Sequence, residues 1–270
     1  MRALCGLVPV PRTHLLCEDD SVLGQAFFIM DFVDGRLLTD ARMVEAKREE
    51  RRSLCLELVS VLARLHQVDY RAVGLEDFGK TGGYVPRQLS RLSNQYAASR
   101  IEDNADMDLL IRWLEDNLPH NDESAIVHGD YRSYNVIFET NAPRIAAVLD
   151  WELATIGHPL ADLAFCCLPY HMSEHDPRGF RGENPLHLGI PAEAELLQHY
   201  CRETGRDHLP DWRYFVVFSL FRSAAIRAGV YKRAFDGSAA SANAVEAGRT
   251  YRDSAAAAAR LIETSEAATL

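Results

Sequence analysis

Two stretches decide the fold of this chain: residues 126–138 read IVHGDYRSYNVIF and residues 145–152 read IAAVLDWE. Each contains a short run of β-branched and aliphatic residues, and a polar, turn-like segment lies between them, which predicts a β-hairpin. Antiparallel pairing brings the start of the first strand beside the end of the second. We therefore expect Asn135 and Asp150 to meet at one end of the hairpin.

The residues at that end suit a metal ion together with phosphate. An amide oxygen and a carboxylate are ligands of the kind that Mg²⁺ uses, and Mg²⁺ fills its other positions with water and phosphate oxygens of a substrate. Asp130 precedes Asn135 by five positions, so its carboxylate stays within reach of the metal and is placed to accept a proton. The pattern predicts a site for Mg²⁺ and a phosphate compound.

Each of these residues also has an ordinary structural interpretation. Asp130 suits a turn or a cap, Asn135 the entry of a strand, and Asp150 a strand-end carboxylate bonded to backbone amides. Taken one at a time, these interpretations are the more frequent. Taken together, an Asp, four intervening residues, an Asn and then a strand-borne Asp match the catalytic half of the kinase pattern.

The same residues carry a resemblance to a known family. The triplet HGD at 128–130 with Asn135, followed by LDWELATIGHPLADLA at 149–164, resembles the aminoglycoside phosphotransferase and choline kinase-like family. The second motif is most similar to the kinase-like domain that is fused to some acyl-CoA dehydrogenases. The resemblance runs through nearly the whole chain and implies an α+β, protein-kinase-like fold. Residues 1–33 are expected to form part of a small lobe and its hinge, and residues 34–270 a mainly helical large lobe.

The resemblance also implies an activity. Such enzymes transfer the γ-phosphoryl group of ATP, with Mg²⁺, to a hydroxyl group of a small molecule, and this branch implies a hydroxyacyl compound or hydroxyacyl-CoA as the acceptor. Asp130 is expected to orient and deprotonate the acceptor hydroxyl, while Asn135 and Asp150 hold Mg²⁺. Backbone groups of Asp31 and Val33 are expected to bind the adenine at the hinge.

Two further residues are expected to support the site. By resemblance, Asp162 is a buried carboxylate that braces the catalytic loop and does not bind the metal. His128 is interpreted as an orienting or packing residue, not as the base. The eleven residues between Asp150 and Asp162 leave little room for a peptide-binding segment, which favours a small-molecule acceptor.

Part of the kinase pattern has no counterpart in this sequence. That pattern includes a Gly-rich loop over the phosphates and a strand lysine that pairs with them. The first lysine is Lys47, beyond the expected hinge, and Gly6 and Gly24 stand alone. By resemblance, the chain is expected to begin inside its small lobe. One alternative is therefore a catalytically incomplete kinase-like fragment that acts as a binding module; another is an antibiotic kinase with an acidic acceptor pocket.

Composition excludes several other classes. A hydrophobic content of 47% and a charged content of 25% are ordinary for a soluble globular protein. The net charge of −10 argues against nucleic acid or an anionic membrane as a partner. Six cysteines without a CxxC pair suggest reduced thiols in the cytoplasm, and no apolar run is long enough to span a membrane. Oligomeric state stays open.

The rest of the chain reads as a buried strand at 26–35 followed mainly by helices. His66 is expected to cap the C-terminus of the first helix. Arg178 and Arg181, in a predicted loop at 169–191, are either contacts for an anionic substrate or solvated. Arg222 and Arg227 either line the acceptor pocket or are partly buried beside a carboxylate. The expected helices span 46–66, 88–100, 107–118, 192–203, 211–235 and 239–262.

Overall fold

A computed structural model describes residues 1–237 and 244–266. The chain forms two compact units. The first unit comprises residues 1–79, 125–156 and 185–208; the second comprises 80–124, 157–184 and 209–270. The lobe boundary expected at residue 33 stays a prediction.

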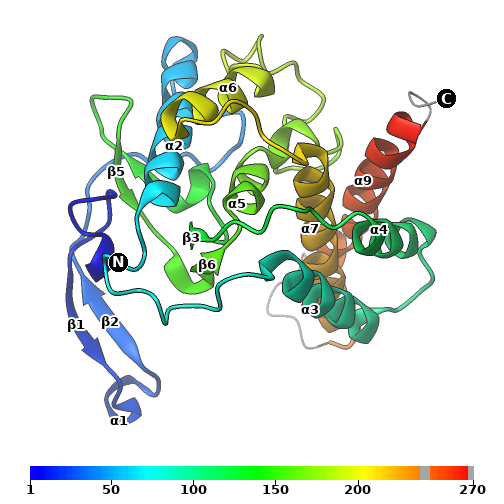
Figure 1. Cartoon of the computed structure of the whole chain (residues 1–270), viewed down its shortest axis with the longest axis horizontal. Coiled ribbons are helices and arrows are strands. Elements are labelled where there is room, and N and C mark those ends of the chain that lie inside the picture. Colours follow the sequence, from blue (N-terminus) through cyan, green and yellow to red (C-terminus); the bar gives the residue numbers. More distant parts are fainter. Residues whose placement is uncertain (238–243, 267–270) are drawn as a thin grey trace. The chain divides into compact units, whose positions relative to one another are not determined.

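The first unit begins with a short 3₁₀ helix, η1 (Arg2–Leu4), and a two-stranded antiparallel ribbon. β1 (Thr13–Cys17) and β2 (Phe27–Met30) pair in this ribbon, and the short helix α1 (Asp20–Leu23) joins them (Figure 1). The prediction of a buried strand was wrong in its burial, since Phe28 is 51% and Ile29 48% exposed. The reason is that, in the described part of the chain, no helix or further strand packs extensively on the faces of this two-stranded ribbon.

Two helices pack side by side in this unit: α2 (Arg48–Gln67) and α6 (Glu193–Thr204) (Figure 1). Their bounds lie within two residues of the predicted ones. The cap predicted for His66 was wrong, because the chain leaves α2 at Val68. The ring of His66 is buried instead, and its Nδ1 is hydrogen-bonded to the hydroxyl of Tyr200 on α6 at 2.8 Å.

The predicted hairpin is confirmed. β4 (Val136–Phe138) pairs antiparallel with β5 (Ile145–Val148), with Val136 opposite Val148. The turn η2 (Ser133–Asn135) precedes this hairpin, and η3 (Trp151–Leu153) follows it. A second strand pair, β3 (Ala125–Val127) with β6 (Thr155–Gly157), was not predicted.

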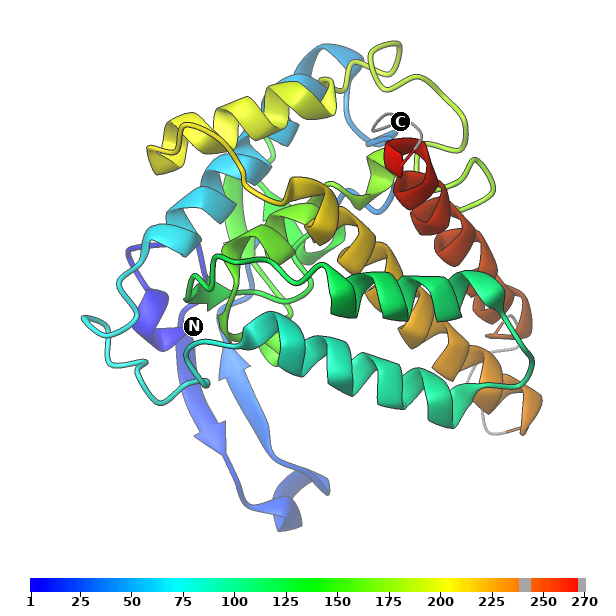
Figure 2. The ribbon, with the colours of Figure 1, turned by 45° about the vertical axis from the view of Figure 1, so that its right-hand side comes forward.

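The second unit is helical. Its central helix, α7 (Trp212–Phe235), packs against α3 (Tyr84–Ser99), α5 (Pro159–Cys166), α8 (Ala244–Arg249) and α9 (Tyr251–Glu266), and α4 (Ala105–Asp116) lies beside α3 (Figure 2). A 3₁₀ turn, η4 (Leu168–Tyr170), opens the irregular segment that the sequence predicted. Among the described helices, none has both the length and the apolarity that a membrane crossing requires.

Two helix predictions in this unit needed correction. α3 begins at Tyr84, four residues before the predicted start, because Gly83 turns the chain in the left-handed region and a proline is tolerated in a first turn. The helix predicted from 239 to 262 is two helices that meet at Thr250. Residues 239–243 of that prediction lie outside the described part of the chain.

Candidate active site

The hairpin places Asn135 and Asp150 at the same end, as the sequence predicted. The amide of Leu149 donates to the carbonyl of Asn135 at 2.8 Å, one step beyond the pair Val136 and Val148. Asp150 follows at once and is exposed, with φ 61° and ψ 58°. A residue with a Cβ costs about 1–2 kcal/mol in this left-handed region, so the surrounding structure must hold Asp150 there.

The carboxylate of Asp130 lies in contact with Asn135. Its Oδ2 accepts a hydrogen bond from Nδ2 of Asn135 at 2.8 Å and another from Nη2 of Arg132 at 2.8 Å. Nδ2 of Asn135 also donates to the backbone carbonyl of Asp130 at 2.9 Å. Because both partners of this amide nitrogen are acceptors, the orientation of the Asn135 side chain is fixed.

Arg132 was not singled out from the sequence. It forms an ion pair with Asp130, and its guanidinium lies over the ring of Tyr134, 5.3 Å from the centroid. Its position two residues after Asp130, inside the predicted catalytic loop, was the available signal.

His128 connects the two halves of the site. Its ring is fully buried, Nε2 donates to the carbonyl of Leu149 at 2.7 Å, and Nδ1 accepts from the amide of Asp130 at 3.2 Å. A carbonyl can only accept, so the proton is on Nε2. The ring also packs on Trp151, with centroids 4.8 Å apart. These contacts support the orienting role predicted for His128.

The backbone at Gly129 requires a glycine at the centre of the HGD triplet. Its φ is +85°, and a Cβ at this position would lie 2.6 Å from the carbonyl oxygen of Leu153. Any larger residue would therefore push the loop that carries Asp130 away from η3.

The oxygens expected to hold Mg²⁺ suit that ion. Within residues 1–237 and 244–266, neither Oδ1 of Asn135 nor the carboxylate of Asp150 takes part in a hydrogen bond or ion pair. No group of three or more His, Cys, Asp or Glu side chains in these ranges is arranged to hold a metal. One amide and one carboxylate oxygen form a partial set of the kind that Mg²⁺ completes with water and phosphate.

The residues expected at the hinge line a cavity of about 320 Å³. The amide of Asp31 donates to the carbonyl of Arg12 at 2.9 Å, so of its two backbone groups only the carbonyl remains for a ligand. The amide of Val33 has no acceptor among the described residues. The lining comprises Met30, Asp31, Phe32, Val33, Asp34, Gly35, Leu37, Ile137 and Leu149.

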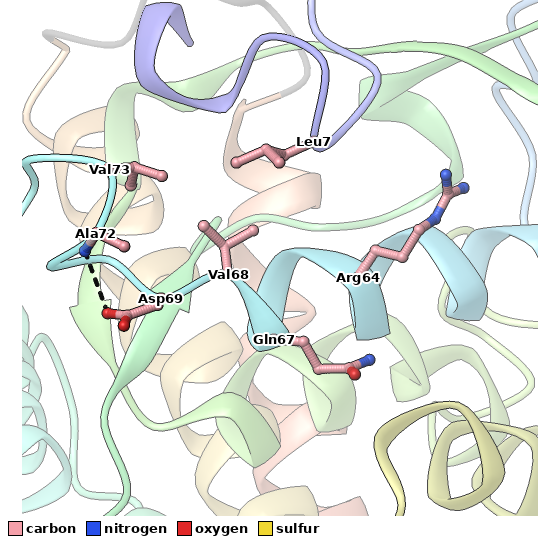
Figure 3. Close-up of a pocket in the computed structure, with 7 residues that line it drawn as sticks. All are labelled: Leu7, Arg64, Gln67, Val68, Asp69, Ala72 and Val73. Carbon is pink, nitrogen blue, oxygen red and sulfur yellow. Dashed lines mark hydrogen bonds between the residues drawn. The ribbon is translucent and has the colours of Figure 1, made fainter.

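A second hollow of about 420 Å³ lies at the C-terminal end of α2 (Figure 3). The side chains of Leu7, Val68 and Val73 turn toward its space, and Asp69 accepts a hydrogen bond from the amide of Ala72 at 3.3 Å (Figure 3). None of the residues predicted to act in the site lines it.

The remaining predicted residues belong to the second unit. Asp162 is 2% exposed, in the first turn of α5, so its predicted burial is confirmed while its bracing role stays a prediction. Arg227 forms an ion pair with Asp176 at 2.8 Å, and Arg178 donates to Asp176 at 3.4 Å and to Ser223 at 2.8 Å. Of the two alternatives for Arg227, the structure shows the buried carboxylate pair.

The other two arginines differ from this pair. Arg222 stacks on Phe165 at 4.8 Å, and Arg181 is exposed and donates to the carbonyl of Pro177 at 3.3 Å.

Comparison with known proteins shows to which family the chain belongs. The model of the phosphotransferase enzyme family, APH, matches residues 1–213. The chain belongs to the APH family. One relative, acyl-CoA dehydrogenase family member 10 of Mus musculus, is 40% identical over 252 residues, which is 92% of this chain and 24% of that protein. The chain thus spans about a quarter of the length of that relative, and it is similar only to that part.

Solved structures support the APH assignment. A crystal structure from Ralstonia eutropha JMP134, provisionally named an aminoglycoside phosphotransferase, is 42% identical and has a TM-score of 0.90, over 97% of this chain and 80% of that one. A mutant of APH(4)-Ia in a ternary complex with ADP and hygromycin B shares the fold, with a TM-score of 0.61, 15% identity and coverage of 95% and 78%. Viomycin phosphotransferase of Streptomyces vinaceus is 49% identical over 51 residues, 18% of this chain and 17% of that protein.

Proposed function

We propose that the chain is an ATP-dependent phosphotransferase domain that acts on a hydroxyl group of a small molecule. The observation that carries the proposal is the position of Leu149. Leu149 lines the hinge cavity, its carbonyl accepts a hydrogen bond from His128, and Asp150 is the next residue along the chain. A nucleotide base in the cavity would therefore have the proposed metal residues beside it.

In this proposal the carbonyl of Asp31 and the amide of Val33 bind the adenine, and Oδ1 of Asn135 and the carboxylate of Asp150 hold Mg²⁺. When bound, Mg²⁺ neutralises part of the phosphate charge. Asp130 accepts the proton of the acceptor hydroxyl. His128 and Gly129 hold the backbone on which Asp130 stands.

The proposed acceptor is a hydroxyacyl compound, such as a hydroxyacyl-CoA. Support comes from the relative named as an acyl-CoA dehydrogenase family member, which carries a segment similar to this chain within a much longer protein. A cytoplasmic location belongs to the same proposal, because all six cysteines are free and suit a reducing compartment.

Nucleotide binding can be tested by filling the hinge cavity. Leu37 lines it and is 51% exposed, so Leu37→Trp is expected to fold and to weaken Mg·ATP binding at least about tenfold in isothermal titration. Leu7, 48% exposed, lines the hollow on α2 and supplies the matched control Leu7→Trp, which should bind as the wild type does. Equal affinity for all three proteins would place the nucleotide elsewhere.

Turnover tests the chemistry. With Mg·ATP and 3-hydroxybutyryl-CoA, Asp130→Asn and Asp150→Ala are each expected to lower kcat at least about a hundredfold. Asp103→Asn, a change at a side chain that is 99% exposed, is the control and should leave kcat unchanged. Near-wild-type turnover in either site variant contradicts the assignment. A wild type that binds Mg·ATP but transfers no phosphate to any acceptor would favour the binding-module alternative.

An antibiotic kinase is the second candidate, and the local identity to viomycin phosphotransferase favours it. Parallel assays with viomycin and hygromycin B as acceptors separate the two. Phosphorylation of an antibiotic at a higher kcat/KM than 3-hydroxybutyryl-CoA would replace the hydroxyacyl proposal.

A further inference from the structure

We propose that Arg132 is a positioning residue that fixes the plane of the Asp130 carboxylate, so that the oxygen not bonded to Arg132 faces the hydroxyl of the acceptor. The inference rests on the proposed phosphotransferase function and deepens it, because it assigns a role to a residue of the same site. It concerns two side chains that the structure places 2.8 Å apart, Nη2 of Arg132 and Oδ2 of Asp130.

The two oxygens of the Asp130 carboxylate have different surroundings. Oδ2 accepts from Arg132 at 2.8 Å and from Asn135 at 2.8 Å. Oδ1 accepts no hydrogen bond from any residue in the described part of the chain. Each carboxylate oxygen has about two lone-pair sites, so Oδ2 is saturated and Oδ1 has both sites available for a hydroxyl group.

A carboxylate does not keep such an orientation without help. The χ2 torsion of an aspartate is broad, so the plane of the carboxylate can turn away from this orientation at little cost. The charge-assisted bond from Arg132 opposes that rotation, and such bonds are roughly twice as strong as neutral ones. Asn135 alone is a weaker restraint, because its Nδ2 is shared with the carbonyl of Asp130.

Arg132 is itself held in place. Its side chain is 32% exposed, and its guanidinium packs over the ring of Tyr134, 5.3 Å from the centroid. Stacking of a planar guanidinium fixes the direction of its N–H groups, which a lysine ammonium does not reproduce.

In the proposed reaction, every bond that forms is matched by one that breaks. The acceptor O–H bond breaks and its proton goes to Oδ1 of Asp130, while the acceptor oxygen forms a bond to the γ-phosphorus of ATP. The bond from that phosphorus to the bridging oxygen breaks, and ADP leaves with the electron pair. Asp130 afterwards releases the proton to water, so the carboxylate is restored.

Crystal structures and kinetics of Arg132→Gln and Arg132→Lys test the inference. In Arg132→Gln, the Asp130 carboxylate is expected to turn out of its contact with Asn135, and kcat is expected to fall about ten- to a hundredfold. KM for ATP should change by less than about threefold, because Arg132 does not line the hinge cavity. Arg132→Lys should recover part of kcat, since it restores the charge without the fixed direction.

Arg144→Gln is the matched control. Arg144 forms an ion pair with Glu139 at 2.9 Å in the same hairpin region and is 68% exposed. Within the described part of the chain, it makes no hydrogen bond or ion pair with Asp130, Asn135 or Asp150. Its loss should leave both Asp130 and kcat unchanged.

The outcomes separate this inference from the proposed function. An Asp130 carboxylate that keeps its place in Arg132→Gln overturns the positioning role, and so does an unchanged kcat. A wild type that transfers no phosphate, combined with a carboxylate that turns in Arg132→Gln, supports the positioning role and counts against the proposed function.

Discussion

His128 Nε2 and the carbonyl oxygen of Leu149 are 2.7 Å apart, in a hydrogen bond between residues 21 positions apart in the sequence. The bond ties the loop that carries Asp130 to the strand end that carries Asp150. Since Nδ1 of the same ring accepts from the amide of Asp130, one buried side chain sets the spacing of the two carboxylates.

Replacement of this ring should uncouple the two segments. His128→Phe keeps a ring but leaves two backbone groups without their partner, at a cost of about 1–3 kcal/mol in the free energy of unfolding. We also expect kcat to fall at least about tenfold, because the geometry of the site relaxes. Urea denaturation and steady-state kinetics measure the two effects.

His66→Phe is the control for that variant. His66 is also buried and hydrogen-bonded, to Tyr200, but belongs to the pairing of α2 with α6. It should lower stability and leave kcat unchanged. An equal loss of kcat in both variants would show that general stability, and not the link to Leu149, is responsible.

The contact at Gly129 predicts a difference between two glycines. Gly129 and Gly24 have nearly the same φ, +85° and +81°, but a Cβ on Gly24 would meet no atom within 4 Å, whereas one on Gly129 would lie 2.6 Å from the carbonyl oxygen of Leu153. Gly24→Ala should therefore cost about 1–2 kcal/mol from backbone strain alone. Gly129→Ala should cost more and should also abolish turnover. Equal losses in urea denaturation would show that the contact relaxes freely.

Two buried tyrosine hydroxyls are expected to contribute differently to stability. Tyr131 is fully buried, and its hydroxyl donates to the carbonyl of Leu58 at 2.8 Å. Tyr131→Phe should lower the free energy of unfolding by about 0.5–1.5 kcal/mol. The hydroxyl of Tyr96 is buried without a partner in the described residues, so Tyr96→Phe should be neutral or stabilising. A greater loss in Tyr96→Phe than in Tyr131→Phe would contradict this.

Asp176 predicts a pH dependence of stability. Burial raises the pKa of Asp176, but the hydrogen bond from Arg227 and the charge of Arg178 lower it by more, so its pKa lies below the ordinary value. Because this pKa is lowered by folding, the Asp176 carboxylate stabilises the fold fully at pH values above its pKa in the unfolded chain, about 3.9. This stabilisation is lost as the pH falls through the pKa in the folded chain. At pH 7, Asp176→Asn should lower the free energy of unfolding by about 3 kcal/mol, because Arg227 loses its carboxylate partner.

Urea denaturation at pH values from 3 to 7 checks this expectation. The method resolves differences in the free energy of unfolding on the order of a few tenths of a kcal/mol. The difference between wild type and Asp176→Asn should be constant from about pH 7 to pH 5 and should shrink below about pH 4. Asp103→Asn, at a 99% exposed carboxylate, should show little difference at any pH. A difference for Asp176→Asn that grows on acidification would overturn the assignment.

The sequence alone determined the features that depend on neighbouring residues. The hairpin of β4 and β5 follows from two apolar runs and a polar turn, and its pairing then fixes that Asn135 and Asp150 lie at one end. The α2 helix follows from its apolar period in the same way. The family motifs are local as well, which is why the sequence alone indicates the phosphotransferase family.

Tertiary structure alone decided the contacts between residues far apart in the chain. No local pattern shows that His128 reaches Leu149, that Asp176 meets Arg227, 51 positions away, or that β3 pairs with β6. The exposure of β2 is of the same kind, since an apolar strand is buried only if another element covers it. The physical reason is that sequence periodicity reports the preference of one segment, whereas burial and hydrogen-bond partners depend on the packing of several.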